Sequence, residues 1–464
     1  MEAVAPIFKR LSCILWSEIE KWTPESVLLR FGKLPDGWRL LPVGAFAAQL
    51  ENREKVKPVS EYRMAGVRWY GEGVFHRETV VGKEQSANYL YPLKPGAIIY
   101  NRLFAWKESF AVVPDELDGF YVSNEFPQFE IDQAIALPKY IYLLFNTQKI
   151  IGAVNAASIG SAAISRNRFK ESDFLGFKVP IPPLPIQQKI VAHWEAAQAS
   201  VTAAKARVAE IDKELQARFL SDLGLPKPKR STPPKCFAEN WESFERWSVS
   251  YNQAAMSMID LTLGKYPVVE LGSILDMVQY GTSEKANTSE KGTPVLRIKN
   301  IKDGRIDTSE LKHIALGKKA LASLRLIDGD ILIIRTSGSH DLVGTCAVFH
   351  EKGDFVFASY LIRLRPSPEK ALSDFITWYV NSPVGRQQVN SLSRQIMQNN
   401  INSQELRSIL LPLPPIDVQK EIMERIEKGR NAIDQQAETA NRLYSQTQID
   451  IEKMILGTSP VEAH

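Results

Sequence analysis

The sequence lacks the motifs that enzymes acting on DNA or nucleotides carry. Its 464 residues contain no G-x-x-x-x-G-K-[ST] phosphate loop and no strand-associated G-x-G-x-x-G segment. The D/N-P-P-Y/F motif that adenine methyltransferases use is missing. Pro114 and Asp115 could begin a nuclease carboxylate cluster, but no E-x-K segment follows them at a suitable spacing. These absences favour a binding protein over an enzyme.

Cysteine and histidine are scarce and scattered. The three cysteines (Cys13, Cys236 and Cys346) are odd in number and unclustered, which argues against a disulfide framework. The six histidines show no metal-ligand spacing. We therefore expect no metal and no cofactor on this chain, and a reducing, cytoplasmic setting.

Long apolar runs are also missing, so the sequence predicts no contact with a membrane. The N-terminus lacks a basic region followed by a clean apolar stretch and a cleavage site, and we interpret it as structural. Hydrophobic residues make up 44% of the chain and charged residues 24%, which is ordinary for a globular protein. The formal net charge of +4 is only a weak indication of a polyanionic partner.

What the sequence does contain is the same unit twice. Residues 179–190 read VPIPPLPIQQKI, and residues 411–422 read LPLPPIDVQKEI. Further matches are WSEIEKW at 16–22 with WESFERW at 241–247, and the turn-and-strand segments 95–99 and 328–332. The period is too long for a solenoid, so the chain is a duplicated domain rather than a stack of repeats.

The repeat defines the expected domain boundaries. Residues 1–181 would form an N-terminal segment and a first globular domain, and residues 182–224 would form a long helix. Residues 225–265 would be a linker and the start of the second copy, 266–413 a second domain, 414–457 a second long helix, and 458–464 a tail. The loops between matched segments differ strongly, which suggests the same task performed on two targets.

Both long helices carry an apolar heptad seam. The positions are Ile190, Trp194, Ala197, Val201, Ala204, Val208, Ile211, Leu215 and Phe219 in the first helix, and Ile422, Ile426, Gly429, Ile433, Gln436, Ala440, Leu443, Thr447 and Ile451 in the second. The matching phase predicts an antiparallel pair, although each helix could instead pack only on its own domain. The Pro-rich turns would set the exit angle of each helix. They could also be docking motifs for an aromatic groove, which their repetition at a strand–helix junction disfavours.

The globular halves mix short strand patterns with turns. In the second half we expect strands at 294–301, 330–335, 346–350 and 355–364 and a helix at 369–380. Counterparts in the first half are 97–102, 111–113, 120–131 and 138–146. The expected fold class is α+β with sheet-rich cores.

The loops of both halves are rich in side chains that reach DNA. Arg and Lys bind phosphate or guanine, and Asn and Gln pair with adenine. Each position taken alone could equally be a solvated surface group. Matched pairs, such as Arg68 with Asn300 and Arg102 with Arg335, strengthen the signal. The candidates are Arg63, Arg68, Lys83, Arg102, Lys107, Asn167 and Arg168 in the first half, and Tyr280, Thr282, Lys285, Arg297, Lys299, Asn300, Arg335, Ser337, Ser339, Gln395, Gln398 and Asn399 in the second.

With these motifs the chain resembles a specificity subunit of a type I restriction–modification system. The resemblance lies in the two P-x-P-P-x-x-x-Q motifs (180–187 and 412–419), the GDILIIR run at 329–335 and the SGS…LVG pattern at 337–344. The first half departs from the pattern: Pro185 replaces the usual acidic residue, and its loop lacks SGS.

The resemblance implies two tandem target-recognition domains joined by two long helices, which form an antiparallel coiled coil with pseudo-two-fold symmetry. Each domain would read one half of a bipartite, asymmetric site in double-stranded DNA. Two methyltransferase subunits would dock on the helices and bind S-adenosylmethionine, and a separate restriction and motor subunit would use ATP and Mg. The chain itself would be non-catalytic, with target adenines flipped into a partner's pocket.

Three alternatives stay open from the sequence. The chain could partner a fused nuclease–methyltransferase, or be a coiled-coil scaffold without a DNA role, or be an enzyme whose site has no familiar motif. The first would be decided by the partner's domain content. The second predicts no salt-dependent DNA affinity even in a complex, and the third is disfavoured by the missing motifs.

Overall fold

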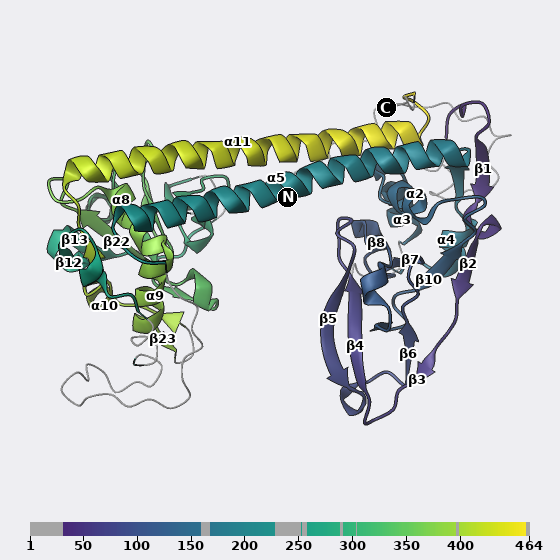
Figure 1. Cartoon of the computed structure of the whole chain (residues 1–464), viewed down its shortest axis with the longest axis horizontal. Coiled ribbons are helices and arrows are strands. Elements are labelled where there is room, and N and C mark those ends of the chain that lie inside the picture. Colours follow the sequence, from purple (N-terminus) through teal and green to yellow (C-terminus); the bar gives the residue numbers. More distant parts are fainter. Residues whose placement is uncertain are drawn as a thin grey trace. The chain divides into compact units, whose positions relative to one another are not determined.

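The computed structural model describes residues 31–158, 168–227, 252, 258–287, 291–302, 304–395 and 399–460. The chain divides into two compact units, shown in Figure 1. Unit 1 comprises Met1–Ala204 and Glu438–His464, and unit 2 comprises Lys205–Ala437. The Trp-containing repeats at 16–22 and 241–247 lie outside the described residues. Within the described ranges, no helix has an apolar stretch long enough for a bilayer crossing.

The described residues of unit 1 form a four-stranded sheet, a five-stranded sheet, a two-stranded stem and three short helices. The antiparallel sheet has the order β2 (Ala47–Leu50), β10 (Gln128–Ile131), β7 (Ile98–Tyr100) and β8 (Phe110–Val112). The five-stranded sheet has the order β3 (Glu54–Lys55), β6 (Tyr89–Pro92), β9 (Tyr121–Val122), β4 (Glu61–Val67) and β5 (Val74–Val81). The helices are α2 (Pro138–Phe145), α3 (Gln148–Ala157) and α4 (Glu171–Gly176). Buried aromatic rings, including Tyr100, Phe129 and Phe174, fill the space between the first sheet and the helices.

Unit 2 repeats the four-stranded antiparallel sheet, in the order β13 (Leu275–Tyr280), β22 (Leu361–Pro366), β18 (Ile331–Ile334) and β20 (Cys346–Val348). A second sheet contains β17 (Lys312–Ile314), β14 (Thr293–Leu296) and β21 (Val356–Phe357), and β15 (Ile301–Lys302) pairs with β16 (Arg305–Ile306). A third contains β19 (Thr336–Ser337), β24 (Asn399–Asn400) and β23 (Arg394–Gln395). The short helices are α7 (Lys318–Leu324), α8 (Ser373–Asn381), α9 (Pro383–Leu392) and α10 (Ser403–Arg407). The expected α+β class with sheet-rich cores is confirmed.

A two-stranded stem closes the globular domain in each unit. In unit 1, β1 (Arg39–Pro42) pairs antiparallel with β11 (Lys178–Ile181). In unit 2, β12 (Val268–Glu270) pairs with β25 (Leu410–Pro412) in the same way. Each stem leads directly into a Pro-rich turn and a long helix, α5 (Leu184–Asp222) or α11 (Ile416–Ile455). The domain boundaries taken from the sequence stay a prediction.

The repeated glutamine fixes the Pro-rich turn. Gln187 is fully buried, and its Oε1 accepts a hydrogen bond from Leu137 N at 2.8 Å. Its Nε2 donates to the carbonyl oxygens of Pro182 at 2.8 Å and Ile135 at 3.0 Å. The amide thus ties the start of α5 to the N-terminus of α2, where Leu137 has no side chain that could cap the helix.

The long helices also end alike. Gly224 and Gly457 follow α5 and α11 with φ of 72° and 67°, a conformation that glycine adopts without steric cost. Leu225 N donates to Leu220 O at 2.8 Å, and Thr458 N donates to Lys453 O at 2.9 Å. Both ends are therefore Schellman caps.

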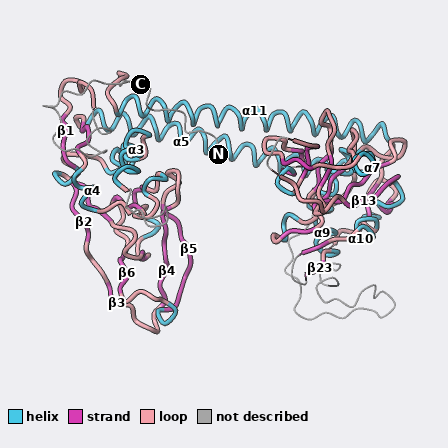
Figure 2. The backbone as a smooth tube through the Cα atoms, turned by 180° about the vertical axis from the view of Figure 1, so that it is seen from behind, coloured by secondary structure: helices cyan, strands magenta, loops and turns pink. Residues whose placement is uncertain are grey.

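Within each unit, the parts of α5 and α11 pack antiparallel, and Figure 2 shows the two helices side by side. In unit 2, Arg425 donates to Asp222 at 2.8 Å, and Gly429 lies against Leu215. In unit 1, Ile190 and Val191 share a core with Ile451 and Ile455. The antiparallel pairing is confirmed, whereas the pseudo-two-fold relation between the units stays a prediction.

The seam of α5 agrees with the heptad pattern, because all nine predicted positions are buried or partly buried. The seam of α11 departs from it at Gln436 and Leu443, which are exposed; Leu443 is 39% accessible. The prediction was wrong at these two positions.

Three predicted strands are interrupted. The run 355–364 is two strands in different sheets, because Leu361 N donates to Ala358 O and closes a turn between β21 and β22. The run 120–131 is likewise split into β9 and β10. The run 294–301 is broken by a 3-10 turn at Ile298–Asn300. Apolar continuity marks burial, but it does not reveal where a strand changes sheets.

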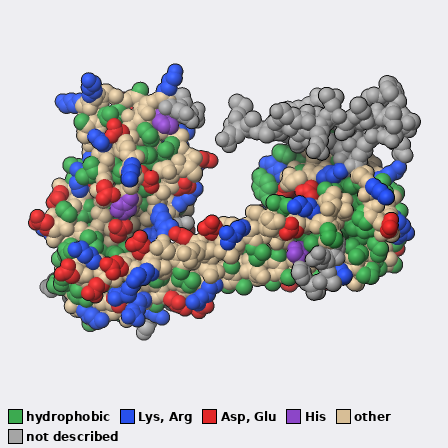
Figure 3. All heavy atoms as spheres, turned by 90° about the horizontal axis from the view of Figure 1, so that it is seen from above, with side chains coloured by type: hydrophobic (Ala, Val, Ile, Leu, Met, Phe, Trp, Pro, Cys, Tyr) green, Lys and Arg blue, Asp and Glu red, His purple; other side chains and the backbone are tan. Residues whose placement is uncertain are grey.

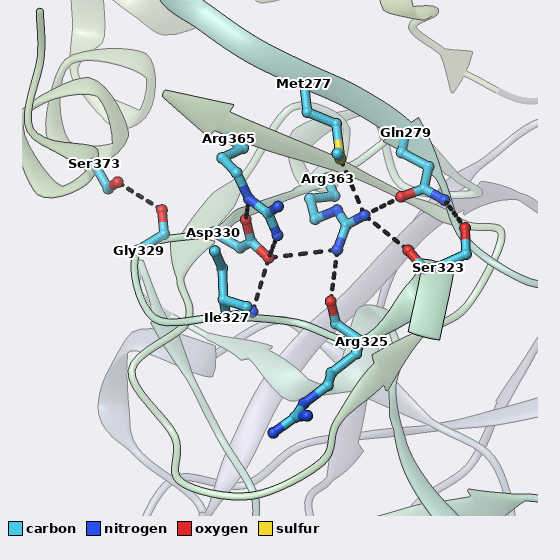
Figure 4. Close-up of polar contacts among 10 residues, drawn as sticks. All are labelled: Met277, Gln279, Ser323, Arg325, Ile327, Gly329, Asp330, Arg363, Arg365 and Ser373. Carbon is cyan, nitrogen blue, oxygen red and sulfur yellow. Dashed lines mark hydrogen bonds and ion pairs between the residues drawn. The ribbon is translucent and has the colours of Figure 1, made fainter. Parts of the chain in front are cut away.

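A buried ionic cluster holds the main sheet of unit 2 together (Figure 4). Asp330 is fully buried and accepts from Arg365 Nε at 2.6 Å and Nη2 at 2.8 Å. Arg363, 2% exposed, lies 3.5 Å from the same carboxylate and donates to the carbonyl oxygens of Arg325 and Ser323. These contacts join β18, β22 and the end of α7, and they compensate charges that burial would otherwise penalise.

Candidate nucleic-acid interface

In unit 2 the small sheet β19–β24–β23 aligns several predicted DNA-binding residues. Ser337 is paired with Asn399, and Asn399 is paired with Gln395 on the other side. Three candidates from two distant parts of the sequence therefore stand in one register row. Gln398 lies outside the described residues.

Arg335 connects this small sheet to the main sheet. Its backbone N donates to Tyr360 O at 2.9 Å, and its carbonyl accepts from Ile401 N at 2.9 Å. Its guanidinium lies 4.9 Å from the centre of the Tyr280 ring, within the range of a cation–π interaction. The Tyr280 hydroxyl accepts from Ser403 N at 3.1 Å, which fixes the ring.

The segment after β13 contributes further candidates to the same region. We call Tyr280, Thr282, Lys285, Arg335, Ser337 and Ser339 the loop cluster of unit 2. Thr282 N donates to Phe357 O at 3.0 Å, and Ser337 Oγ accepts from Ser339 N at 3.1 Å. Gly281 lies so close to β21 that a Cβ atom would sit 2.3 Å from Ala358 O, so glycine is required there. Lys285 and Ser339 are exposed. Tyr280 thus contacts Arg335, and Ser337 and Ser339 follow it along the chain. Thr282 is bonded to Phe357 and Ser359, close in sequence to the Tyr360 that accepts from Arg335 N.

Arg297, Lys299 and Asn300 form a separate group at the 3-10 turn after β14. Lys299 is exposed, and Arg297 donates to Glu310 O at 3.1 Å. Asn300 is only 1% exposed, and its amide is bonded to Arg297 N, Asp307 O and Glu310 O. Asn300 therefore cannot read a base, contrary to the prediction. Its side-chain amide is bonded within its own loop and has no free edge for a ligand.

In unit 1, Arg102 and Arg168 lie beside carboxylates. Arg102 forms an ion pair with Glu171, and both side chains are largely buried. Arg168 donates to Glu125 at 2.6 Å and is exposed. Asn167 lies outside the described residues.

Arg68 and Lys107 belong to an aromatic surface cluster. Lys107 Nζ lies 3.8 Å from the centre of the Trp69 ring, and Trp69 and Tyr70 are 39% and 60% exposed. Tyr70 and Glu108 have left-handed φ values of 58° and 57°, and their loops are joined by a 2.8 Å bond from Tyr70 N to Lys107 O. Strained residues that are held in place this way cluster at functional sites.

The remaining candidates of unit 1 are spread along the β4–β5 hairpin. Arg63 on β4 lies over the Phe120 ring at 4.4 Å, and Lys83 is exposed near the other end of the hairpin from Arg68. The structure therefore does not bring all candidates of unit 1 together.

Sequence reasoning missed three residues that shape these sites: Glu125, Glu171 and Tyr360. Tyr360 is 55% exposed beside Arg335, and the two glutamates neutralise arginines. The only available signal for Glu171 was its place shortly after the predicted Asn167–Arg168 pair.

Charge on the visible face of unit 2, the left-hand body in Figure 3, is mixed, with basic and acidic side chains interspersed. In the part of the chain that the structure describes, no group of three or more His, Cys, Asp or Glu side chains could hold a metal ion. Burial raises the pKa of the Cys346 thiol to about 12, so this thiol stays protonated.

Comparisons with known proteins agree with this architecture. Residues 48–212 and 264–443, more than half of the chain, match the family model described as type I restriction modification DNA specificity domain. The specificity subunit of the type I restriction enzyme EcoKI of Escherichia coli K12 is 28% identical over 277 residues, covering 59% of this chain and 55% of that subunit. The StySPI specificity subunit of Salmonella potsdam is 28% identical over 309 residues, covering 65% and 62%. The matches thus span little more than half the length of these relatives.

A solved structure reported under "Structural basis underlying complex assembly and conformational transition of the type I R-M system" shares the fold. Its TM-score is 0.56 at 18% identity, covering 91% of this chain and 99% of that one. The first matched segment starts within β2 and ends within α5, and the second starts before β12 and ends within α11. The chain therefore belongs to the family of type I restriction–modification DNA specificity domains.

Proposed function

We propose that this chain is the sequence-specific DNA-binding subunit of a type I restriction–modification complex and reads a bipartite, asymmetric site in double-stranded DNA. The observation that carries the proposal is a scaffold built twice with different loops. The buried glutamines and the helix caps are the same in both units, whereas the loops that bear Arg335 and Arg102 differ. A duplicated frame with dissimilar contact loops suits the reading of two different half-sites.

The contact groups would be the loop clusters of the two units. In unit 2 these are Tyr280, Thr282, Lys285, Arg335, Ser337 and Ser339, together with Gln395, Gln398 and Asn399; Arg297 and Lys299 would add phosphate contacts. In unit 1 they are Arg63, Arg68, Lys83, Lys107, Asn167 and Arg168. Arginine and amide side chains read base edges, and exposed lysines position the duplex.

Catalysis would belong to partners. Two methyltransferase subunits would supply S-adenosylmethionine and the adenine pocket, and a restriction and motor subunit would use ATP and Mg. Two surfaces support protein partners on the long helices. Leu443, Tyr444 and Ile449 of α11 are exposed by 39–50%, and exposed apolar side chains of this kind can mark protein contacts. A groove of about 910 Å³ in unit 2 is lined by Leu372 and Met423 and by charged residues of α11, including Lys420, Glu424 and Glu427, and would suit a polar protein surface. The complex would act in the cytoplasm, where host DNA is found.

The test is single-molecule sequencing of host DNA with and without the gene, scoring N6-methyladenine. Loss of one bipartite, asymmetric motif on deletion is the expected result. If no motif is lost, the purified chain and its co-purifying partners should be assayed for salt-dependent DNA binding. A complex that binds no DNA would favour a scaffold role, and a single partner carrying both nuclease and methyltransferase domains would favour the fused-enzyme alternative.

A further inference from the structure

Arg102 and Arg335 occupy the same position in the two units. Arg102 N donates to Glu125 O at 3.0 Å and its carbonyl accepts from Phe169 N at 3.0 Å. Arg335 N donates to Tyr360 O and its carbonyl accepts from Ile401 N, both at 2.9 Å. Each arginine follows the same strand of the four-stranded sheet, β7 or β18. The backbones of Arg102 and Arg335 are therefore held in the same way, although the loops around them differ.

The two guanidinium groups have different partners. Arg102 is paired with Glu171, and both side chains are about four-fifths buried. Ile401 matches Phe169, so Ser403 of unit 2 stands where unit 1 has Glu171. Ser403 has no carboxylate, and its backbone N–H donates a hydrogen bond to the Tyr280 hydroxyl. Among the described residues, no carboxylate lies within ion-pair distance of Arg335, whose guanidinium rests on the Tyr280 ring. The charge of Arg102 is therefore neutralised in unit 1, whereas the charge of Arg335 is available to a ligand in unit 2.

Unit 2 has two unpaired polar groups on the segments that meet at Arg335. Arg335 Nε is inaccessible to solvent and has no hydrogen-bond partner, and the same holds for Oδ1 of Asn400, next to Ile401. Buried polar groups are nearly always paired. These two groups lie on segments that are joined by the hydrogen bond from Ile401 N to Arg335 O, and they favour a ligand that would pair them. Arg102 Nε is also unpaired, but its guanidinium already carries the Glu171 ion pair.

We propose that Arg335 is a specificity-determining residue that contacts a guanine in the half-site read by unit 2, whereas Arg102 is a positioning residue of unit 1. This inference rests on the proposed DNA-binding function. Arginine donates two parallel hydrogen bonds to guanine O6 and N7, which requires a fixed orientation of the guanidinium. The Tyr280 ring and the two backbone bonds supply this orientation. Exposed lysines such as Lys285 and Lys299 suit phosphate, which needs no fixed orientation.

The experiment uses the chain in complex with its co-expressed methyltransferase subunits. The methylated motif is determined for the wild type, and binding is then measured on duplexes in which each guanine of the motif is replaced singly by 7-deazaguanine. We expect one guanine, in one half-site, at which the replacement weakens wild-type binding but not binding by Arg335→Ala. Arg335→Ala should weaken binding to the native site roughly 5- to 150-fold and relax the motif at that position. Tyr280→Leu should give a smaller loss at the same guanine.

Lys352→Ala, an exposed lysine outside the loop cluster, is the matched control and should bind like the wild type. Unchanged recognition of the other half-site shows that the Arg335 variant is folded. If Arg335→Ala weakens binding equally for every sequence, Arg335 contacts phosphate and the inference fails. A motif in which no guanine depends on Arg335 overturns it too, while leaving the DNA-binding function intact. A wild-type complex that recognises no sequence would contradict the proposed function itself.

Discussion

Gln187 and Gln419 make the same three hydrogen bonds in their two units. Gln419 Oε1 accepts from Leu372 N at 2.9 Å, as Gln187 Oε1 accepts from Leu137 N at 2.8 Å. Gln419 Nε2 donates to Pro414 O at 2.8 Å and Lys370 O at 3.3 Å, the counterparts of Pro182 and Ile135. Both side chains are fully buried. The glutamine of the repeated motif therefore links each recognition domain to its long helix through hydrogen bonds.

Replacing this glutamine should destabilise its unit. Gln187→Ala leaves Leu137 N–H and two carbonyl groups without partners, and each buried unpaired group costs about 1–3 kcal/mol. We expect the free energy of unfolding to fall by at least about 2 kcal/mol in denaturant titrations. The adjacent Gln188 is exposed, so Gln188→Ala should change stability by less than about 0.5 kcal/mol. Equal effects of the two substitutions would contradict the role of Gln187.

Removing the charge of Asp330 should be more damaging than removing a surface carboxylate. Asp330→Asn leaves Arg363 and Arg365 without their anion, and breaking a buried ion pair costs roughly 3–5 kcal/mol. Asp354→Asn removes an exposed partner of Arg325 and should cost no more than about 1 kcal/mol. Chemical denaturation of both variants checks the difference, and a stable Asp330→Asn protein would mean that the cluster is dispensable.

A larger residue at Gly429 should force the Leu215 side chain to move, because α5 approaches α11 closely there. A Cβ atom at this position would lie 2.4 Å from Leu215 Cδ2. We expect Gly429→Val to lower stability by about 1–3 kcal/mol through overpacking. The same change in a Leu215→Ala background should cost less, and additive effects of the two substitutions would rule out the contact as the cause.

Stability should depend on pH through His350. Burial opposes its protonation, but the hydrogen bond to Asp328 and the nearby Asp374 carboxylate outweigh burial and raise the pKa of His350. A raised folded-state pKa stabilises the fold below the ordinary value of 6.5, and this contribution is lost as pH rises through the folded-state pKa. The stability difference between wild type and His350→Gln should therefore be larger at about pH 5.5 than at about pH 8.5. A difference that stays constant between these pH values would show that His350 does not titrate.

Exchanging residues 266–413 for the matching domain of a relative should change one half of the recognised sequence. The reason is that the recognition domain of unit 2 has its own core and its own stem. Methylome sequencing of cells that express the hybrid gives the readout. A change in both halves, or in neither, would contradict the assignment of one half-site to each unit.

The parts of the structure that repeat were predictable from sequence, because a motif seen twice identifies matched positions. The pairing of Arg102 with Arg335 is one example, and the ends of α5 and α11 are another. The unpredicted parts depend on contacts between distant segments. The Arg102–Glu171 ion pair and the burial of Asn300 are set by the folding of loops, which residue type does not reveal. Gln436 and Leu443 fit the heptad spacing but are exposed, because spacing gives no information on how wide the contact face is.

The paired stems also bear on how new specificities arise. Because β1 pairs with β11 and β12 with β25, each recognition domain enters and leaves its frame at adjacent strands. Genetic recombination at the two ends of such a segment would replace a whole recognition domain and leave the stems and long helices unchanged. If each domain reads one half-site, as we propose, replacing one domain would change one half of the recognised sequence, and two independently replaced domains would let the number of possible DNA sites grow with the product of the choices at the two positions.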